Sequence, residues 1–519
     1  MVRISGTSIE RYVYWGEIIM NTYIHTPKII SYNDIIECDF NLSSSRHKKF
    51  EIANPNYKLV KEFLTRALSR KDLGVEIGSA NYIGQSSHYF LRTKALQDHS
   101  YLPEITSETA LPIMPSSFVK MNLKAGDLII SKDGNIGEIV ILDKDYPNYM
   151  LSGALYKLPV GEHKYYLLAM MKHSIFREQL NFIVPKGATI RHAKTLFLDC
   201  KIPMPNDDVN NTIQFVENLT QAIINKQRII KERHQAILTL IEKELLDNQQ
   251  KDNGFSYAYP SINCIQENGR MDATFYSEYY KRLMFPVLNY SGGYAPLTEQ
   301  GLELKPGPSL EIKLLETRID SDFYIKGFYR LITPKQILNT GVINKERFIG
   351  TPKKISTIQF GDILFGESGT GRTMVYLDDC KNTINNAHAH ILRPIKRKCT
   401  LDKAITIRSI MQYYKEKGIT DCLTVGGNGG HLSPSYFDRV FIPSLSTVKQ
   451  REIAKLYYNR INYDIKNATL DNFLTLDDDF NSKAGIYELD KTAKQLQNTL
   501  NQAIESIIEN KPVNMQISS

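Results

Sequence analysis

The feature that most constrains this chain is an internal repeat, because repeated sequence predicts repeated structure. A Gly-Asp pair, a short apolar run and a glycine-rich turn occur at residues 126–140 and again at 361–375. The two Gly-Asp pairs are 235 residues apart (361 minus 126). Further along, an Ile-Pro step follows each copy, at 202–203 and at 442–443.

A third landmark falls between the other two in each copy. It is a polar loop marked by glycine, at residues 186–192 in the first half and 426–433 in the second. Three landmarks in the same order, at nearly the same spacing, indicate that the chain contains two copies of one module.

Each copy is followed by a segment with the spacing of a helix that packs against another helix. Residues 212–246 contain no Gly or Pro, and four β-branched residues recur there every seven positions, namely Val216, Ile223, Ile230 and Ile237. Lys226 and Arg233 occupy the second core row, so this seam is imperfect. Because each helix ends a repeat, we expect the two to pair as an antiparallel coiled coil.

The second helical segment is interrupted. It begins at residues 447–467, is broken near 472–488, and resumes with a four-and-three spacing of apolar residues, namely Leu489, Ala493, Leu496, Leu500, Ala503 and Ile507. The expected order along the chain is an N-terminal extension (1–29), a first module (30–206), a first spacer helix (207–250), a second module (265–445), a second spacer helix (446–511) and a disordered tail (512–519). Short apolar runs alternating with turns inside each module predict an α+β fold.

Composition excludes several classes of protein. Apolar residues make up 42% of the chain, yet none of its segments approaches the ~20 uninterrupted apolar residues of a membrane helix. Six cysteines without a C-x-x-C pair argue against a zinc knuckle or a disulfide framework. We therefore expect a cytoplasmic protein without a membrane partner, and the net charge of +8 permits an anionic one.

The turn of the second copy resembles a phosphate-binding loop at first sight. Residues 366–373 read GESGTGRT, one residue away from G-x-x-x-x-G-K-[ST]. A phosphate loop needs a helix after the turn, whereas the residues from Thr373 onward are β-branched and aromatic. The counterpart at 131–138 reads SKDGNIGE and matches no nucleotide signature. Both turns are predicted to be hairpin tips that present polar side chains.

Two other motifs carry little weight. Asn54-Pro-Asn-Tyr57 differs at its third position from the Asn-Pro-Pro-Tyr of adenine methyltransferases, and no cofactor-binding glycine turn precedes it. His388 and His390 lie on one face of a predicted strand, but no third metal ligand accompanies them. We therefore expect neither methyltransferase activity nor a metal in this chain.

Two Gly-Asp hairpin modules, each ending in a glycine-rich loop and an Ile-Pro step before a long helix, resemble the specificity (S) subunit of type I restriction–modification systems. The resemblance begins at about residue 30. Residues 270–276 (RMDATFY) and 318–324 (RIDSDFY) resemble the Arg-hydrophobic-Asp-x-x-(Phe/Tyr)-Tyr pattern of that family, whereas residues 37–41 are a degenerate form of it.

The resemblance implies a non-catalytic protein with two target-recognition domains, each reading one half of a split sequence in double-stranded DNA. The helices would separate the two halves and dock two methyltransferase (M) subunits, and through them restriction/translocase (R) subunits. S-adenosylmethionine, ATP and Mg would be cofactors of those partners, and this chain would bind none. The alternative is a coiled-coil scaffold whose modules make protein–protein contacts.

Base recognition requires forked or amide side chains, and phosphate recognition requires cations. Residues of these kinds occur in five polar loops and are the candidate DNA contacts: Gln85 and Ser86; Lys132 and Asn135; Lys186, Thr189, Arg191 and His192; Ser368, Thr370 and Arg372; Asn428, His431 and Ser433.

Overall fold

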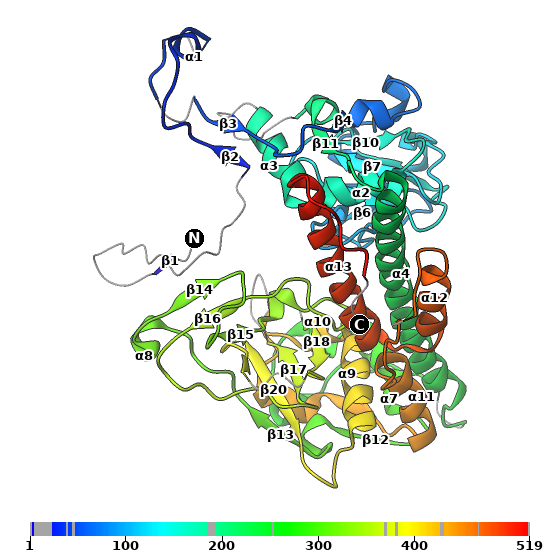
Figure 1. The fold of residues 1–519 in the computed structure, drawn as a ribbon. Coiled ribbons are helices and arrows are strands. Elements are labelled where there is room, and N and C mark those ends of the chain that lie inside the picture. The colour runs from blue at the N-terminus through cyan, green and yellow to red at the C-terminus, as the bar shows by residue number, and fades with distance from the viewer. Residues whose placement is uncertain are drawn as a thin grey trace. The chain divides into compact units, whose positions relative to one another are not determined.

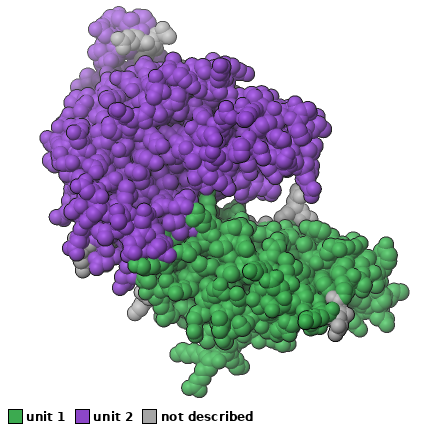
Figure 2. Space-filling model, turned by 90° about the vertical axis from the view of Figure 1, so that its right-hand side faces the viewer, with its two compact units in different colours: residues 1–17, 230–461, 483–490 green, residues 18–229, 462–482, 491–519 purple. Residues whose placement is uncertain are grey.

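The computed structural model describes residues 3–4, 23–37, 40–43, 47–184, 193–251, 254–367, 371–378, 382–425, 430–465 and 467–516. Figure 2 colours the two compact units into which the chain divides. Unit 1 comprises residues 1–17, 230–461 and 483–490, and unit 2 comprises residues 18–229, 462–482 and 491–519. Each unit contains one copy of the sequence repeat.

Unit 2 contains a hairpin sheet, a second sheet and two strand pairs. The hairpin sheet has the order β10-β7-β8, with β7 at Leu128–Ser131, β8 at Ile139–Ile141 and β10 at Leu155–Leu158. The second sheet has the order β6-β5-β9, with β5 at Tyr89–Leu91, β6 at Ala110–Pro112 and β9 at Tyr149–Leu151. The pairs are β4 (Tyr57–Leu59) with β11 (Lys201–Pro203), and β2 (Ile24–His25) with β3 (Lys49–Phe50).

Unit 1 has the same kinds of sheet. Its hairpin sheet has the order β13-β20-β17-β18, with β13 at Leu302–Lys305, β17 at Ile363–Gly366, β18 at Thr373–Val375 and β20 at Ala389–Pro394. Its second sheet, β1-β14-β16-β15-β19, consists of Arg3–Ile4, Ile319–Ser321, Phe348–Gly350, Tyr329–Leu331 and Thr383–Ile384. Strand β12 (Tyr294–Pro296) pairs with β21 (Phe441–Pro443).

Equivalent strands have equivalent neighbours in the two units. The central hairpin is antiparallel in both, β5 pairs in parallel with β9, and β15 pairs in parallel with β19. Both Ile-Pro steps, in β11 and β21, pair with a strand in the early part of the module, β4 or β12. The chain is an α+β protein that contains two copies of one module, as the repeat predicts.

The apolar runs of the hairpin strands are buried on both faces, which explains why they do not alternate with polar residues. In unit 2, Leu128 and Ile130 of β7 belong to the core that includes the helices, whereas Ile129 belongs to the core shared with β5 and β9. Successive side chains of a strand point to opposite faces, so one run supplies both cores.

Helices follow each hairpin sheet. In unit 2 they are α2 (Lys164–Lys172) and α3 (Ser174–Ile183), and in unit 1 they are α9 (Leu401–Glu416) and α10 (Ile419–Leu423). Helix α2 packs against β8, and α9 packs against β18, the equivalent strand (Figure 1). The hairpin therefore has a helix behind it in both modules.

Short helices begin each module. They are α1 (Tyr32–Glu37) in unit 2, and α5 (Ile262–Asn268), α6 (Ala273–Tyr276), α7 (Glu278–Leu288) and α8 (Ile312–Leu315) in unit 1. The Arg270 guanidinium donates to the Asp272 carboxylate at 2.8 and 2.7 Å and to the Leu423 carbonyl at 2.8 Å. Because Arg270 is only 3% exposed, this motif holds α6 against α10 and serves the fold.

The long helices α4 (Val209–Asp247) and α13 (Ile486–Ile508) pair in unit 2. Leu219 and Ile223 of α4 share one buried core with Leu500 and Ile504 of α13. The start of α4 meets the end of α13, because the Asn54 amide donates to the carbonyls of both Met204 and Ile507. The pair is antiparallel, and the colours of the two ribbons run in opposite directions (Figure 1). The predicted helix pairing is confirmed.

The second spacer differs from the expected single interrupted helix. It comprises α11 (Thr447–Tyr457), α12 (Phe473–Lys483) and α13, so residues 473–483 are helical, and the described residues before them, 458–465 and 467–472, have irregular backbone. Asp477 on α12 is 1% exposed, and its Oδ1 lies 2.7 Å from Nζ of Lys226, which is 0% exposed. The imperfection in the α4 seam thus has a buried partner.

The C-terminal segment, expected to be disordered, has contacts as far as it is described. Val513 and Met515 pack against the core of unit 2. Within the described residues, none of the helices combines the length and apolarity needed to cross a membrane.

Candidate nucleic-acid interface

The hairpin of unit 2 is closed by its own backbone. The Gly137 amide donates to Ser131 O at 2.9 Å, and the Glu138 amide donates to Asn135 O at 3.1 Å. Gly137 has a φ of +82°, and a Cβ there would lie 2.8 Å from Leu180 Cδ2, so this position requires glycine. At the tip, Asn135 is exposed and Lys132 forms an ion pair with Asp133.

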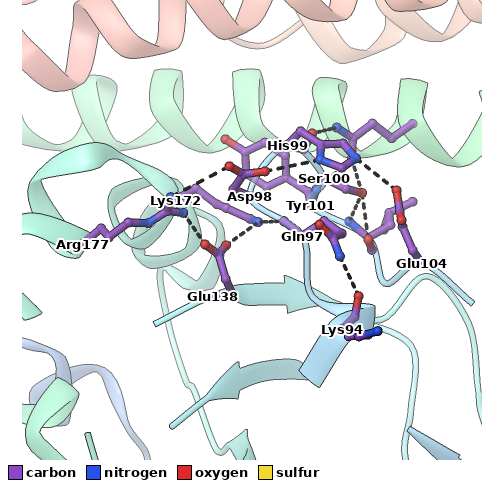
Figure 3. Close-up of polar contacts among 12 residues, drawn as sticks. Lys94, Gln97, Asp98, His99, Ser100, Tyr101, Glu104, Glu138, Lys172 and Arg177 are labelled. Carbon is purple, nitrogen blue, oxygen red and sulfur yellow. Dashed lines mark hydrogen bonds and ion pairs between the residues drawn. The ribbon is translucent and has the colours of Figure 1, made fainter. Parts of the chain in front are cut away.

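Buried charges anchor the base of this hairpin (Figure 3). Glu138, the residue before β8, lies 3.8 Å from Lys172 Nζ on α2 and also accepts a short hydrogen bond from Arg177 on α3. Lys172 Nζ donates to the Gln97 carbonyl at 2.7 Å. Burial raises the pKa of Glu138 and lowers the pKa of Lys172 to about 8. Both helices therefore contact the hairpin through Glu138.

A histidine joins the neighbouring loop to the same cluster. His99 Nδ1 lies 3.3 Å from Asp98 Oδ1, and its Nε2 lies 3.0 Å from Glu104 Oε1. Burial opposes the charged imidazole, but the hydrogen bonds with both carboxylates outweigh it and raise the pKa of His99 to about 9. The loop is also fixed to α4, because the Tyr101 amide donates to Gln227 Oε1 at 2.8 Å.

The hairpin of unit 1 is an antiparallel pair of strands, with Phe365 opposite Thr373. The residues from Thr373 to Val375 form a strand, so the helix required by a phosphate-binding loop is missing and the hairpin prediction is confirmed. Arg372 is half-buried, and its Nη1 donates to the Ile337 carbonyl at 3.1 Å. Ser368 and Thr370 lie outside the described residues.

A buried arginine lies behind this hairpin, on α9. Arg408 is 0% exposed, and it donates from Nε to Thr373 O at 2.9 Å and from Nη2 to Asn339 O at 2.8 Å. Its guanidinium also lies over the Tyr457 ring, 5.0 Å from the centroid. Burial lowers the pKa of Arg408.

The repeated Gly-Asp pair has one structural task in both units. Asp127 Oδ2 accepts from the Lys124 amide at 2.7 Å and lies 2.6 Å from Lys157 Nζ on β10. Asp362 Oδ2 accepts from the Gln359 amide at 2.8 Å and from Arg393 on β20 at 2.6 Å. Each carboxylate therefore holds a turn and pairs with a cation on the third strand. The motif that identified the repeat belongs to the scaffold.

The same backbone hydrogen bond joins the two candidate DNA loops in each unit. In unit 2 the Ala193 amide donates to Lys132 O at 2.9 Å, so the residue after the 186–192 loop pairs with the hairpin. In unit 1 the Leu432 amide donates to Glu367 O at 3.2 Å, which joins the end of the 426–433 loop to the equivalent hairpin. Lys186, Thr189, Arg191, His192 and Asn428 lie outside the described residues.

The remaining candidates have distinct environments. Val425 and His431 exchange backbone hydrogen bonds of 3.0 and 2.9 Å, which close the glycine-rich loop of unit 1 and leave the His431 side chain exposed. Ser433 caps the next turn by accepting from the Ser435 amide. Ser86 donates to the Ile113 carbonyl at 2.6 Å, so its hydroxyl serves the fold, whereas Gln85 beside it is exposed.

A polar cavity next to the unit 1 loops contains residues that the sequence analysis missed. Lys415, Thr420, Asp421 and Thr424 line it, together with Glu367, Gly371, Gly430 and Leu432. The missed residues come from α9, α10 and the turn after α10, where nothing in their spacing distinguishes them from ordinary helix surface.

The two motifs given little weight have structural partners. Asn54 is 1% exposed, and its amide donates to the carbonyls of Met204, shortly before α4, and of Ile507 in α13. His390 lies 3.2 Å from Glu367, and the described residues include no group of three or more His, Cys, Asp or Glu side chains placed to hold a metal ion.

Three solved structures are similar to nearly the whole chain. One is a crystal structure of the type I restriction–modification system S subunit from M. genitalium, with 10% identity and a TM-score of 0.40, covering 88% of this chain and 97% of that chain. Another concerns complex assembly and conformational transition of the type I R-M system, with 11% identity and a TM-score of 0.27, covering 89% of this chain and 99% of that chain. The third is a crystal structure of the HsdS subunit from Thermoanaerobacter tengcongensis, with 11% identity and a TM-score of 0.25, covering 88% of this chain and 97% of that chain.

No family model matches the chain, and no curated protein matches it in sequence.

Proposed function

We propose that this chain is a non-catalytic DNA-recognition subunit of a type I restriction–modification complex, which binds a bipartite target. One observation carries the proposal: each unit presents a hairpin tip and a second polar loop, joined by the same backbone hydrogen bond, from Ala193 to Lys132 and from Leu432 to Glu367. A repeated scaffold whose loops differ in side chains is suited to binding two different sequences.

The loops divide into base and phosphate contacts by chemistry. Asn135 and Gln85 are exposed amides, the side chains that pair with adenine. Lys132, Arg372 and His431 supply positive charge or hydrogen-bond donors suited to phosphate oxygens or guanine. Ser86 and Ser433 are engaged with backbone groups, so we assign them to loop shape.

The helices have a different role in the proposal. Residues 30–206 and 265–445 would be the two recognition domains, and 207–250 and 446–511 the spacer segments that dock two methyltransferase subunits. Helix α4 has 39 residues, and a helix of that length measures about 58 Å. One turn of DNA measures about 34 Å, so such a helix suits a spacer between half-sites. S-adenosylmethionine, ATP and Mg are assigned to the partner subunits.

The decisive experiment combines a map of methylation with a binding assay. Adenine methylation in host DNA, mapped with and without this gene, would supply the target sequence. The purified chain with its methyltransferase partner should then bind DNA carrying that target roughly 10³-fold more tightly than DNA lacking it, the low end of specific recognition. Equal binding to both DNAs would overturn the proposal.

A matched pair of variants sharpens the test. Lys132→Ala combined with Asn135→Ala removes two candidate contacts from the unit 2 hairpin and should weaken binding to the target. Lys61→Ala removes an exposed lysine paired with Asp199 in the same unit and should leave binding unchanged. The scaffold alternative would be favoured if the chain bound another protein equally well with and without DNA, and if the two variants changed that binding equally.

A further inference from the structure

The proposed function assigns no role to the cavity of unit 1 that is lined by Lys415, Thr420, Asp421 and Thr424. Its volume is about 270 Å³, and it lies where the hairpin and the glycine-rich loop meet α9 and α10. That volume is below the ~300–1,000 Å³ of pockets for drug-sized ligands, so the space suits one small planar group rather than a whole cofactor.

Two glycines keep the cavity open. Gly371 comes from the hairpin, and a Cβ there would lie 3.0 Å from Thr420 Cγ2. Gly430 comes from the glycine-rich loop, and a Cβ there would lie 2.7 Å from Thr424 Oγ1. A side chain at either position would press against the threonine wall. Both candidate DNA loops of unit 1 thus contribute a bare backbone wall to one cavity.

The charges around the cavity favour a hydrogen-bond donor over a phosphate. Glu367 and Asp421 contribute two carboxylates and Lys415 one ammonium group, which gives a formal charge of −1. Lys415 Nζ lies 2.6 Å from Asp421 Oδ1, and their side chains are 23% and 63% exposed, so both groups reach solvent. A phosphate would meet net repulsion there, whereas an amino group would meet acceptors.

We propose that this cavity recognises one G·C base pair in the half-site bound by unit 1, an inference that rests on the proposed function. In the major groove, cytosine presents its N4 amino group as a donor and guanine presents O6 and N7 as acceptors. Base pairing leaves one N–H of the cytosine amino group free, and the carboxylates of Glu367 and Asp421 share it as acceptors, whereas Lys415 donates to the guanine. Acidic side chains and lysine are the chemical types that suit these two base edges.

In unit 2 the position equivalent to Glu367 carries a side chain of opposite charge. Lys132 occupies the position of Glu367, as the matching backbone hydrogen bonds to Ala193 and Leu432 show, and it pairs with Asp133. The base preference assigned to this cavity therefore applies to one half-site only.

The test uses the full chain in complex with its methyltransferase partner. Competition binding on a set of DNAs, each with one base pair of the mapped target replaced, gives the preference at every position. Asp421→Asn and Glu367→Gln should reduce discrimination at one G·C position by about fivefold or more, about 1 kcal/mol, and leave the other half-site unchanged. Glu303→Gln, an exposed carboxylate on β13 of the same unit, should change nothing.

The outcomes separate this inference from the proposed function. If the unaltered complex shows no preference at any position, the proposed function fails. If it discriminates normally and both variants keep full discrimination at every G·C position, the cavity is not a base-reading site. A uniform loss of affinity for all DNAs, without a change in preference, also overturns the inference. Thermal unfolding of each variant shows whether its fold is intact.

Discussion

Lys172 in unit 2 and Arg408 in unit 1 have the same place in the repeated module but different partners. Each lies on the helix behind the hairpin and donates to a backbone carbonyl of a neighbouring loop, Gln97 or Asn339. Lys172 also meets the Glu138 carboxylate, whereas Arg408 forms no ion pair with a residue that the structure describes. A buried cation can therefore be held by a carboxylate or by backbone carbonyls and an aromatic ring.

The side chains explain the two solutions. Arginine presents five N–H donors in a planar fork, so it can bond two separate carbonyls and stack on Tyr457 at the same time. Lysine presents a compact charge on a flexible stem, and its pKa shifts readily when it is buried. The comparison predicts that the stability of unit 1 depends more on Arg408 than the stability of unit 2 depends on Lys172.

Replacement of the two cations should give the largest effects. Arg408→Met leaves the carbonyls of Thr373 and Asn339 without a donor in a buried site and should lower the free energy of unfolding by about 3–5 kcal/mol. Lys172→Met should cost about 1–2 kcal/mol, because Glu138 keeps Arg177 as its partner. Urea unfolding of the full chain measures both changes. A loss for Lys172→Met that equals or exceeds the loss for Arg408→Met would contradict the comparison.

The glycine that makes room for Arg408 should come next. Gly341 has a φ of +87°, and a Cβ there would lie 2.6 Å from Arg408 Nη2. Gly341→Ala should lower the free energy of unfolding by about 2–4 kcal/mol, since it adds a steric clash to backbone strain of about 1–2 kcal/mol.

Gly327→Ala is the matched control, because its φ is +90° and no atom lies within 4 Å of the added Cβ. This variant should show the backbone strain alone, about 1–2 kcal/mol. Equal losses of unfolding free energy for Gly341→Ala and Gly327→Ala would mean that Arg408 moves to accommodate the added methyl group at little cost.

The charge cluster of unit 2 should make stability depend on pH. His99 has a pKa of about 9 in the folded state against about 6.5 when unfolded, so its contribution is complete below pH 6.5 and is lost as pH rises toward 9. Between pH 6.5 and 8 the free energy of unfolding should fall by about 1–2 kcal/mol. Above pH 8 the lowered pKa of Lys172 acts in the opposite direction. His99→Asn should flatten the profile measured by urea unfolding at each pH; an unchanged slope would refute the assignment.

Glu138→Gln should have the smallest effect. Burial raises the pKa of this carboxyl, so a neutral amide of the same shape loses little, and Arg177 is 44% exposed and regains water. We expect a change below about 1 kcal/mol in urea unfolding. A larger loss would show that the carboxylate charge itself holds the hairpin.

Much of the fold was predictable because it follows from patterns of adjacent residues. The Gly-Asp hairpins, the Ile-Pro strands and the apolar stripe from Leu489 to Ile507 all have the structure that their spacing indicates. Long-range pairing was not predictable. Lys226 appears in sequence as a flaw in a seam, and Asp477 as part of an acidic run, because their contact joins residues far apart in the chain.

In the candidate site, too, features of adjacent residues were predictable and long-range contacts were not. Loops that carry glycines next to amides and cations stand out in a sequence, so Lys132, Asn135, Arg372 and His431 could be named as candidate DNA contacts, and they stay predictions. The polar side chains of α9 and α10 did not stand out, because their position beside the hairpin arises only from the packing of α9 against β18. The hydrogen bond from Ser86 to the Ile113 carbonyl was not predictable, since it joins residues 27 positions apart.

The pairing of Lys226 with Asp477 also limits how the spacer can change length. Lys226 Nζ is held by Asp477 and Asn481 between the rings of Tyr463 and Phe480, with no exposed surface. Sliding α12 along α4 by one turn, about 5.4 Å, would bury both charges without partners at a cost of several kcal/mol. The spacer therefore has one permitted register, and an insertion or deletion in α4 would be tolerated only with a compensating change in the segment that carries Asp477.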